Sequence, residues 1–228
     1  MARKLIFNLS KGESPVILRG QYDSPFVRRV AIALNLYGHS YEHRPWSAFG
    51  DAEVLGDHNP LRRVPALSLD DGECLFECAA ILDHLDELAT PDSRLLATSG
   101  RARRSGLRTS ALASGMCDKM ISLIYERVFH PTVAEDWVRR CLTQVLGALG
   151  ALETECSVLQ TPYWHGTAPG HADAAVACAI RFLHEAHAGI AAAGSRPFLT
   201  AHSARCEALA AFHSVVQPFA PPGDRLLE

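Results

Sequence analysis

The sequence changes its pattern near residue 90, and this change limits the folds open to the chain. Before it, short apolar runs of strand length alternate with helical spacings and with turn signals such as Asp71-Gly72. After it, long amphipathic patterns with helical spacing follow one another. We therefore expect an α/β domain over 16–90 and an all-α helical bundle over 91–228, preceded by an N-terminal extension over 1–15.

The expected first domain has the order β-α-β, a loop, and then β-β-α. Its strands are predicted at 16–18, 41–45, 66–69 and 73–75, and its helices at 25–37 and 77–88. After the second strand, residues 46–58 are polar and contain two glycines, which indicates a loop with at most a short helix. The closely spaced Pro60 and Pro65 then favour an extended turn over 59–65.

The second domain is predicted to hold helices at 99–129, 137–159, 172–188 and 204–216. The third of these is very apolar, so we expect it at the centre of the bundle. Gly194-Ser195-Arg196-Pro197 is expected to break the chain before the last helix, and the tail from Pro218 is proline-rich.

Ser24 stands at the joint between the first predicted strand and the first predicted helix. Pro25 suits the first helical position and moves Ser24 out of the helical region into the conformation of an N-cap, while Gly38 closes the helix. Ser24 can be only a cap, since Ser is among the preferred N-cap residues. Alternatively, its hydroxyl and the free N–H groups of the first turn can face a ligand anion.

The charge and the apolar runs of the chain exclude some classes of protein. The 228 residues include 22 basic and 25 acidic ones, and the net charge of -3 offers no electrostatic footprint for nucleic acid or an anionic membrane. No apolar run is long enough to span a membrane, and a signal-peptide core is missing, so we expect a cytoplasmic protein. The seven cysteines contain no CxxC pair and lie mostly in helical patterns, which favours buried, reduced thiols.

Three motifs follow one another in the first domain. They are Ser-Pro-Phe-Val-Arg at 24–28, Asn-Pro-Leu-Arg-Arg-Val-Pro-Ala-Leu at 59–67, and Leu-Phe-Glu-Cys-Ala-Ala-Ile at 75–81. Together they resemble the glutathione-binding domain of cytosolic glutathione transferases, and the helical remainder is similar to the second domain of that family. The resemblance implies a thioredoxin-like α/β domain, then an all-α helical-bundle domain. It also implies a homodimer.

The resemblance assigns a glutathione site to particular residues. Ser24 would be the catalytic residue and would donate to the glutathione sulfur. Val64, just before a proline that is cis in this family, would pair its backbone with the cysteinyl part of glutathione. Glu77 and the next residue would hold the γ-glutamyl end at a helix N-terminus. The full implied glutathione-binding set is Ser24, Phe26, Arg63, Val64, Glu77 and Cys78.

Three features depart from the family pattern. Cys78 stands where the family usually has Ser, whose hydroxyl binds the γ-glutamyl carboxylate, and a thiol is only a weak donor. The loop over 46–57 offers no Lys or Arg for the glycine carboxylate, so Arg63 is either its partner or a solvated surface charge. A helix-capping box keeps Asp173 at its fourth position but begins with Gly170 instead of Ser or Thr; Gly is a tolerated cap, so we expect the fold to hold.

Other residues suggest rival sites. His184 and His187 are one helical turn apart and near Cys178, but a second pair of ligands is missing, so we expect no metal. Cys78 is either a redox thiol or a buried structural one, and without a CxxC partner the structural role is favoured. One mixed face of the first long helix corresponds to the electrophile pocket of the family: Ser114, Cys117, Asp118, Ile121 and Tyr125.

The function implied by the resemblance is that of a detoxifying glutathione S-transferase. It would activate the thiolate of glutathione, its co-substrate, for attack on a small hydrophobic electrophile, with no cofactor. One alternative is a non-catalytic glutathione- or partner-binding protein of the same fold, which the departure at Cys78 motivates. Another is a glutathione-dependent isomerase or peroxidase. The electrophile itself depends on side chains of the helical domain, and fold-level resemblance does not name it.

Overall fold

The computed structural model describes residues 16–192 and 194–222, and the chain divides into two compact units. The first unit contains the described residues up to Leu95 together with those from Ala210 onward, and the second runs from Leu96 to Leu209. The residues after Ala210 therefore pack with the first unit, although their position in the sequence follows the helical one. The expected N-terminal extension over 1–15 lies outside the described residues.

The first unit is built on a four-stranded mixed sheet in the order β2-β1-β3-β4. The strands are β1 (Ile17–Arg19), β2 (Glu42–Arg44), β3 (Ala66–Ser68) and β4 (Cys74–Phe76). β1 pairs parallel with β2 and antiparallel with β3, which in turn pairs antiparallel with β4. The expected thioredoxin-like α/β fold of this part of the chain is confirmed.

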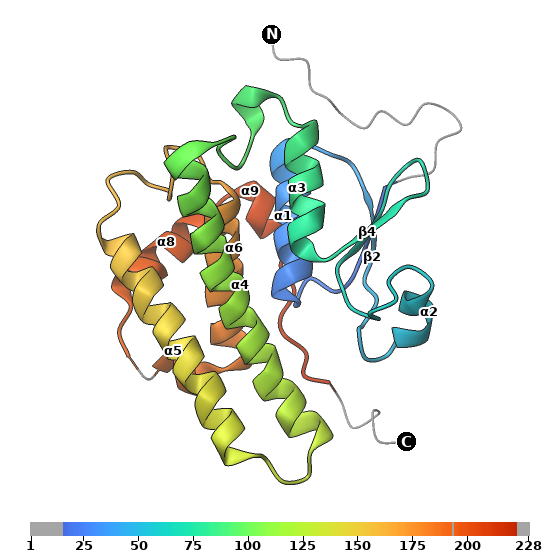
Figure 1. The fold of residues 1–228 in the computed structure, drawn as a ribbon, viewed down its shortest axis with the longest axis vertical. Coiled ribbons are helices and arrows are strands. Elements are labelled where there is room, and N and C mark those ends of the chain that lie inside the picture. Colours follow the sequence, from blue (N-terminus) through green and yellow to red (C-terminus); the bar gives the residue numbers. More distant parts are fainter. Residues whose placement is uncertain (1–15, 193, 223–228) are drawn as a thin grey trace. The chain divides into compact units, whose positions relative to one another are not determined.

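Helix α1 (Pro25–Tyr37) begins and ends where the local sequence requires. Pro25 occupies the first turn, Ser24 is the N-cap with φ -68° and ψ 121°, and Gly38 is a left-handed C-cap with φ 74°. Helix α3 (Cys78–Leu88) follows β4, and the short α2 (Ala52–Gly56) follows β2. Figure 1 shows α1 and α3 together on one side of the sheet and α2 on the other.

Two buried arginines of α1 depart from the usual exposure of charged residues. Arg28 and Arg29 are 2% and 7% exposed. Arg28 donates from Nε to the carbonyl oxygen of Val215 and from Nη2 to that of Phe212, each at 3.0 Å. Because these carbonyls belong to the chain around the short helix α9 (Ala210–His213), the buried guanidinium fixes the C-terminal segment on α1.

The second unit is all-helical, as expected. It contains α4 (Gly100–Phe129), α5 (Glu135–Ser157), α6 (His171–Ala186), the short α7 (Ala188–Ala192) and α8 (Pro197–Glu207). A 3-10 turn at Pro91–Ser93, which still belongs to the first unit, precedes them in the chain. Every residue of α6 from 171 to 180 is buried, and α6 packs against α4 and α8. The central position predicted for this helix is confirmed, since its many alanines let neighbouring helices approach closely.

The last predicted helix was placed wrongly. Residues 204–216 do not form one helix: α8 already starts at Pro197 and ends at Glu207, and α9 is a separate short turn. Pro197 stands in the first turn of α8, where a missing backbone donor has no cost, so it begins this helix instead of breaking the chain.

The cysteines agree with the prediction of buried, unpaired thiols. All seven cysteines lie in the described part of the chain and are free, and all except Cys74 are buried. Of the helices in the described ranges, none has the length and apolarity needed to cross a membrane.

Candidate functional site at one edge of the sheet

A single row of paired residues brings the three sequence motifs to one edge of the sheet. Arg19 of β1 pairs with Ala66 of β3, and Ala66 pairs with Phe76 of β4. β1 and β4 run in the same direction and β3 runs against them. Ser24 and Glu77 therefore lie beyond the carboxyl ends of their strands, while Val64 precedes the start of β3 at that same edge. Helices α1 and α3 consequently present their N-termini there as well.

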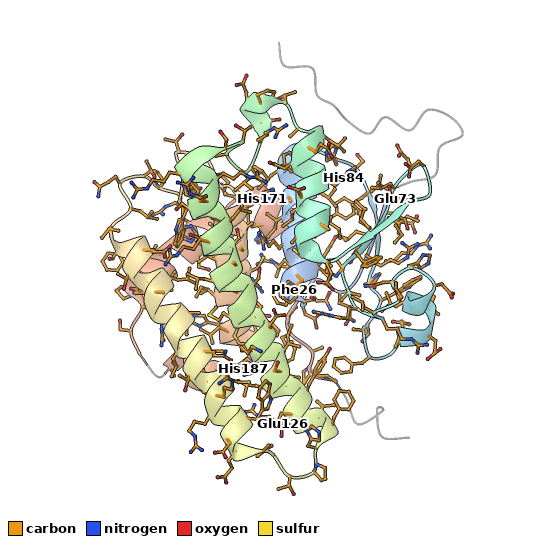
Figure 2. All side chains as sticks on the ribbon, viewed as in Figure 1. Phe26, Glu73, His84, Glu126, His171 and His187 are labelled. Carbon is orange, nitrogen blue, oxygen red and sulfur yellow. The ribbon has the colours of Figure 1, made fainter. Side chains whose placement is uncertain are left out.

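Ser24 is held at its joint by a tight turn. Its N–H donates to the carbonyl oxygen of Gln21 at 3.2 Å, and its Oγ accepts from the N–H of Val27 at 3.5 Å. The second contact is long and uses only a lone pair, so the O–H hydrogen is left to donate to another group. Ser24 is half-buried, as is the neighbouring Phe26, which Figure 2 shows at the N-terminal end of α1.

Gly20 lets the turn before Ser24 approach the second motif. It has φ 127°, and a Cβ built on it would lie 2.4 Å from Cγ2 of Val27 and 2.8 Å from Cβ of Val64. Any side chain would therefore collide both with Val27 in the first turn of α1 and with Val64, which precedes β3. The peptide bond between Val64 and Pro65 is cis, as the resemblance implied.

Asn59 orders the loop that leads to Val64. It is fully buried, donates from Nδ2 to the carbonyl oxygen of Arg63 at 2.8 Å, and accepts at Oδ1 from the N–H of Leu61 at 2.9 Å. Asn59 and Gly20 are structural supports of the site that the sequence reasoning did not single out. The signals were present, since a glycine follows the first strand and an asparagine opens the Asn-Pro motif.

Glu77 and Cys78 stand at the beginning of α3 in very different surroundings. Glu77 is the N-cap residue and has φ 66°, a strained conformation of the kind that clusters at functional sites. Its side chain is 46% exposed, whereas Cys78 is 5% exposed. Burial raises the pKa of the Cys78 thiol; the Arg29 guanidinium lowers that pKa to a smaller extent, and the Glu77 carboxylate raises it.

Arg63 lies beside Glu77. Its Nη1 is 3.5 Å from Oε1 of Glu77, and its side chain is 51% exposed. Ala79 and Ala80 in the first turn of α3 are exposed, and the first N–H groups of a helix have no partner within the helix. The edge of the sheet thus offers a hydroxyl donor, a carboxylate, a guanidinium and two helix N-termini.

The rival residues lie elsewhere. His187 is buried and its Nε2 lies 3.0 Å from the carbonyl oxygen of Met120, while His184 is exposed. No group of three or more His, Cys, Asp or Glu side chains suited to a metal occurs within residues 16–192 and 194–222. On α4, Cys117 is buried, and the other four residues of the predicted mixed face are at least partly exposed: Ser114, Asp118, Ile121 and Tyr125.

Comparisons with known proteins match both parts of the chain to the family that the three motifs resemble. Residues 18–93 match the family model of the glutathione S-transferase N-terminal domain, and residues 135–205 match that of the glutathione S-transferase C-terminal domain. The chain is 30% identical over 167 residues to maleylacetoacetate isomerase of Pseudomonas aeruginosa, covering 67% of this chain and 74% of that protein. It is 27% identical over 178 residues to the uncharacterized GST-like protein YibF of Escherichia coli, covering 73% and 81%.

A solved structure has the same fold over almost the whole chain. It is a glutathione S-transferase of Methylobacterium radiotolerans in complex with glutathione sulfonate, with a TM-score of 0.83 and 25% identity. The alignment covers 93% of this chain and 99% of that one.

Proposed function

Because the chain belongs to the glutathione S-transferase family, we propose that it binds glutathione at the edge of the sheet and activates its thiol for attack on a small hydrophobic electrophile. The observation that carries the proposal is the row Arg19-Ala66-Phe76, which places Ser24, Val64 and Glu77 at one edge. The match to the family model of the glutathione S-transferase N-terminal domain and the structural relative in complex with glutathione sulfonate support glutathione as the ligand.

The activating group in this proposal is the Ser24 hydroxyl. An unperturbed thiol has a pKa near about 8.5, so only a few per cent of it is thiolate at neutral pH. A hydroxyl donor and a helix N-terminus that lower the pKa by about two units favour the thiolate by roughly 2.7 kcal/mol. The thiolate then becomes the dominant form, and catalysis consists mainly of activating and positioning the sulfur.

The remaining residues of the edge suit the rest of the peptide. Glu77 pairs with the γ-glutamyl amine, and the first N–H groups of α3 suit the γ-glutamyl carboxylate. The backbone of Val64 pairs with the cysteinyl part, and Phe26 adds apolar contact near the thiol. Arg63 is the candidate for a ligand carboxylate, in competition with the Glu77 carboxylate that lies 3.5 Å away. This chemistry uses glutathione as a co-substrate and requires no cofactor.

A glutathione-dependent isomerase is the second candidate, because one relative is named maleylacetoacetate isomerase and is 30% identical over 74% of its length. An isomerase uses the same thiolate but regenerates glutathione, so the two functions differ in whether glutathione is consumed. The homodimer, the cytoplasmic location and the role in detoxification expected from the sequence also belong to this proposal, and light scattering tests the first of them.

Retention on immobilised glutathione, followed by assay with an activated aromatic halide, tests the proposed function. Retention together with consumption of glutathione supports the transferase. Retention with turnover of maleylacetoacetate and no net consumption of glutathione supports the isomerase. Retention with neither activity supports a binding protein, and a protein that flows through the resin does not have the proposed site.

Replacing Glu77 by Gln is expected to weaken glutathione binding by about tenfold or more, because the lost charge-assisted bond to the ligand amine contributes roughly 1.5–3 kcal/mol. Isothermal titration calorimetry measures the effect. Glu73→Gln is the matched control: Glu73 precedes β4 and Glu77 follows it, so the two stand at opposite ends of one strand. If Glu77→Gln binds glutathione as tightly as Glu73→Gln and the wild type do, the proposed γ-glutamyl site is wrong.

Replacing Cys78 by Ser is expected to tighten glutathione binding by about two- to tenfold, since a hydroxyl is a better donor to a carboxylate than a thiol is. The two side chains are nearly the same size, so the fold should hold, and Cys78→Ala controls for loss of the thiol. Titration of all three proteins makes the comparison. Weaker binding by the serine variant would show that the site is adapted to the thiol, and would favour another ligand or a redox role.

A further inference from the structure

A segment near the end of the chain runs along α1 toward the site. We call residues 211–220 the C-terminal strap. Asn35, near the end of α1, donates from Nδ2 to the carbonyl oxygen of Ala211 at 3.2 Å and to Oγ of Ser214 at 3.1 Å. Arg28 then binds the carbonyls of Phe212 and Val215. Figure 1 shows α9 beside α1 and the red chain after it continuing past the lower end of this helix.

The strap ends on the turn that precedes Ser24. The N–H of Tyr22 donates to Oε1 of Gln217 at 3.0 Å, and the N–H of Ala220 donates to Oδ2 of Asp23 at 3.3 Å. Tyr22 and Asp23 are the two central residues of the turn that the bond from Ser24 N–H to Gln21 closes. The strap thus holds both central residues of the turn by hydrogen bonds that β1 and α1 do not provide.

The same turn is also held by β2 and the residue before it. The ring of Tyr22 stacks on that of His43, with centroids 3.8 Å apart and an angle of 5°, and its hydroxyl lies 2.9 Å from that of Tyr41. Nε2 of His43 lies 2.8 Å from the carbonyl oxygen of Gly20. The turn is therefore held by the aromatic contact as well as by the strap, and we infer that the position of Ser24 depends on both.

We propose that the C-terminal strap positions the Ser24 hydroxyl for thiol activation, with Gln217 as the positioning residue. The strap is anchored by the buried side chains of Phe212 and Val215, 0% and 2% exposed, and Pro218 restrains the chain directly after Gln217. Loss of the Gln217 amide leaves the Tyr22 N–H without this acceptor and lets the turn shift. This inference rests on the proposed function, because it acts through Ser24.

The test compares three variants in the full chain. Gln217→Ala removes the acceptor, and Gln217→Glu keeps an acceptor oxygen on a side chain of the same length. Asn35→Ala removes two hydrogen bonds at the far end of the strap, where Arg28 and the buried Phe212 still hold it in place. Thiolate absorbance against pH gives the pKa of bound glutathione, and steady-state kinetics separates kcat from KM. Gln217→Ala should raise the thiol pKa and lower kcat at neutral pH about fivefold or more, because a shift of the order of 1 Å can cost up to about a hundredfold. The KM for glutathione should stay within about twofold of that of the wild type, because Glu77 and α3 are untouched.

Each outcome bears on the proposal. Gln217→Glu should restore the wild-type thiol pKa, and Asn35→Ala should lower the melting temperature alone. A wild-type thiol pKa in Gln217→Ala, or an equal rise in Asn35→Ala, overturns the positioning role. If Gln217→Ala does not fold, Gln217→Met keeps the side-chain length without the amide and takes its place.

Amide exchange at Tyr22 separates this inference from the proposed function, because it needs no glutathione. Faster exchange in Gln217→Ala than in the wild type supports the hydrogen bond by which the strap holds the turn, and equal exchange overturns it. A wild-type protein that does not lower the thiol pKa of glutathione overturns the proposed function and the positioning role together.

Discussion

Replacing Ser24 by Ala is expected to lower turnover at neutral pH by about tenfold to a hundredfold, because a hydrogen bond to a charged sulfur contributes roughly 1.5–3 kcal/mol. The lost bond favours the thiolate over the thiol, so the pKa of bound glutathione should rise toward about 8.5. As the pH rises through that value, the thiol ionises without the hydroxyl, and the difference from the wild type should shrink. Profiles of kcat against pH measure this convergence.

The cap role of Ser24 has to be separated from its role toward sulfur. An N-cap Ser replaced by Ala costs about 1 kcal/mol of stability, whereas replacement by Gly costs only a few tenths. Ser24→Gly should therefore melt close to the wild type and yet lose as much activity as Ser24→Ala. Two profiles that run parallel to the wild type at every pH would instead leave Ser24 as a cap alone.

Local signals in the sequence were sufficient to predict the helix ends and the hairpin that surround the site. Ser24, Pro25 and Gly38 predict both ends of α1 through cap geometry, and Asp71-Gly72 predicts the hairpin of β3 and β4. These features depend on neighbours in the chain, so a linear pattern contains them. The placement of Val64 and Glu77 at the same edge as Ser24 came from the family resemblance, and the strand register gives its physical cause.

Features that depend on distant residues were missed. Arg28 is a charged residue on the helix that a pattern would place toward solvent, but carbonyls almost two hundred positions later in the chain satisfy it, and it is 2% exposed. On α3, helical spacing predicts one apolar face made of Ala80, Ile81, Leu85 and Leu88. Of these, Ile81 and Leu85 are buried as predicted, whereas Ala80 and Leu88 are exposed. The C-terminal strap was likewise missed. Its first residues were predicted to lie in a helix over 204–216, but hydrogen bonds from Arg28 and Asn35 hold this segment on α1.

In the second unit, the buried carboxylate of Asp173 connects several elements of the fold. It is 1% exposed and stands in the first turn of α6, where a negative charge is favourable. Its Oδ2 accepts from the N–H of Gly170 at 2.8 Å; its Oδ1 accepts from the N–H of Trp164 at 2.9 Å and faces Nε2 of His202 at 2.8 Å. The carboxylate thus joins the start of α6, the loop before it and α8, which explains why Gly170 suffices as the cap residue.

Replacing Asp173 by Ala is expected to destabilise the protein by about 3–5 kcal/mol, because it leaves the buried partners of the carboxylate unpaired. In a chain of this size, such a loss corresponds to a fall in melting temperature on the order of 10 °C. The melting temperature of Asp173→Asn should lie between those of the wild type and Asp173→Ala. The amide oxygen of Asn still accepts a hydrogen bond, but its NH2 group faces another donor. The control is Asp136→Ala in the first turn of α5, where the carboxylate is 91% exposed and the expected loss is below about 1 kcal/mol. Calorimetric melting of the three variants measures the difference. Similar shifts for Asp173→Ala and Asp136→Ala would mean that the buried network contributes no more than a surface cap, and that packing of the apolar face of α6 alone holds the helical unit together.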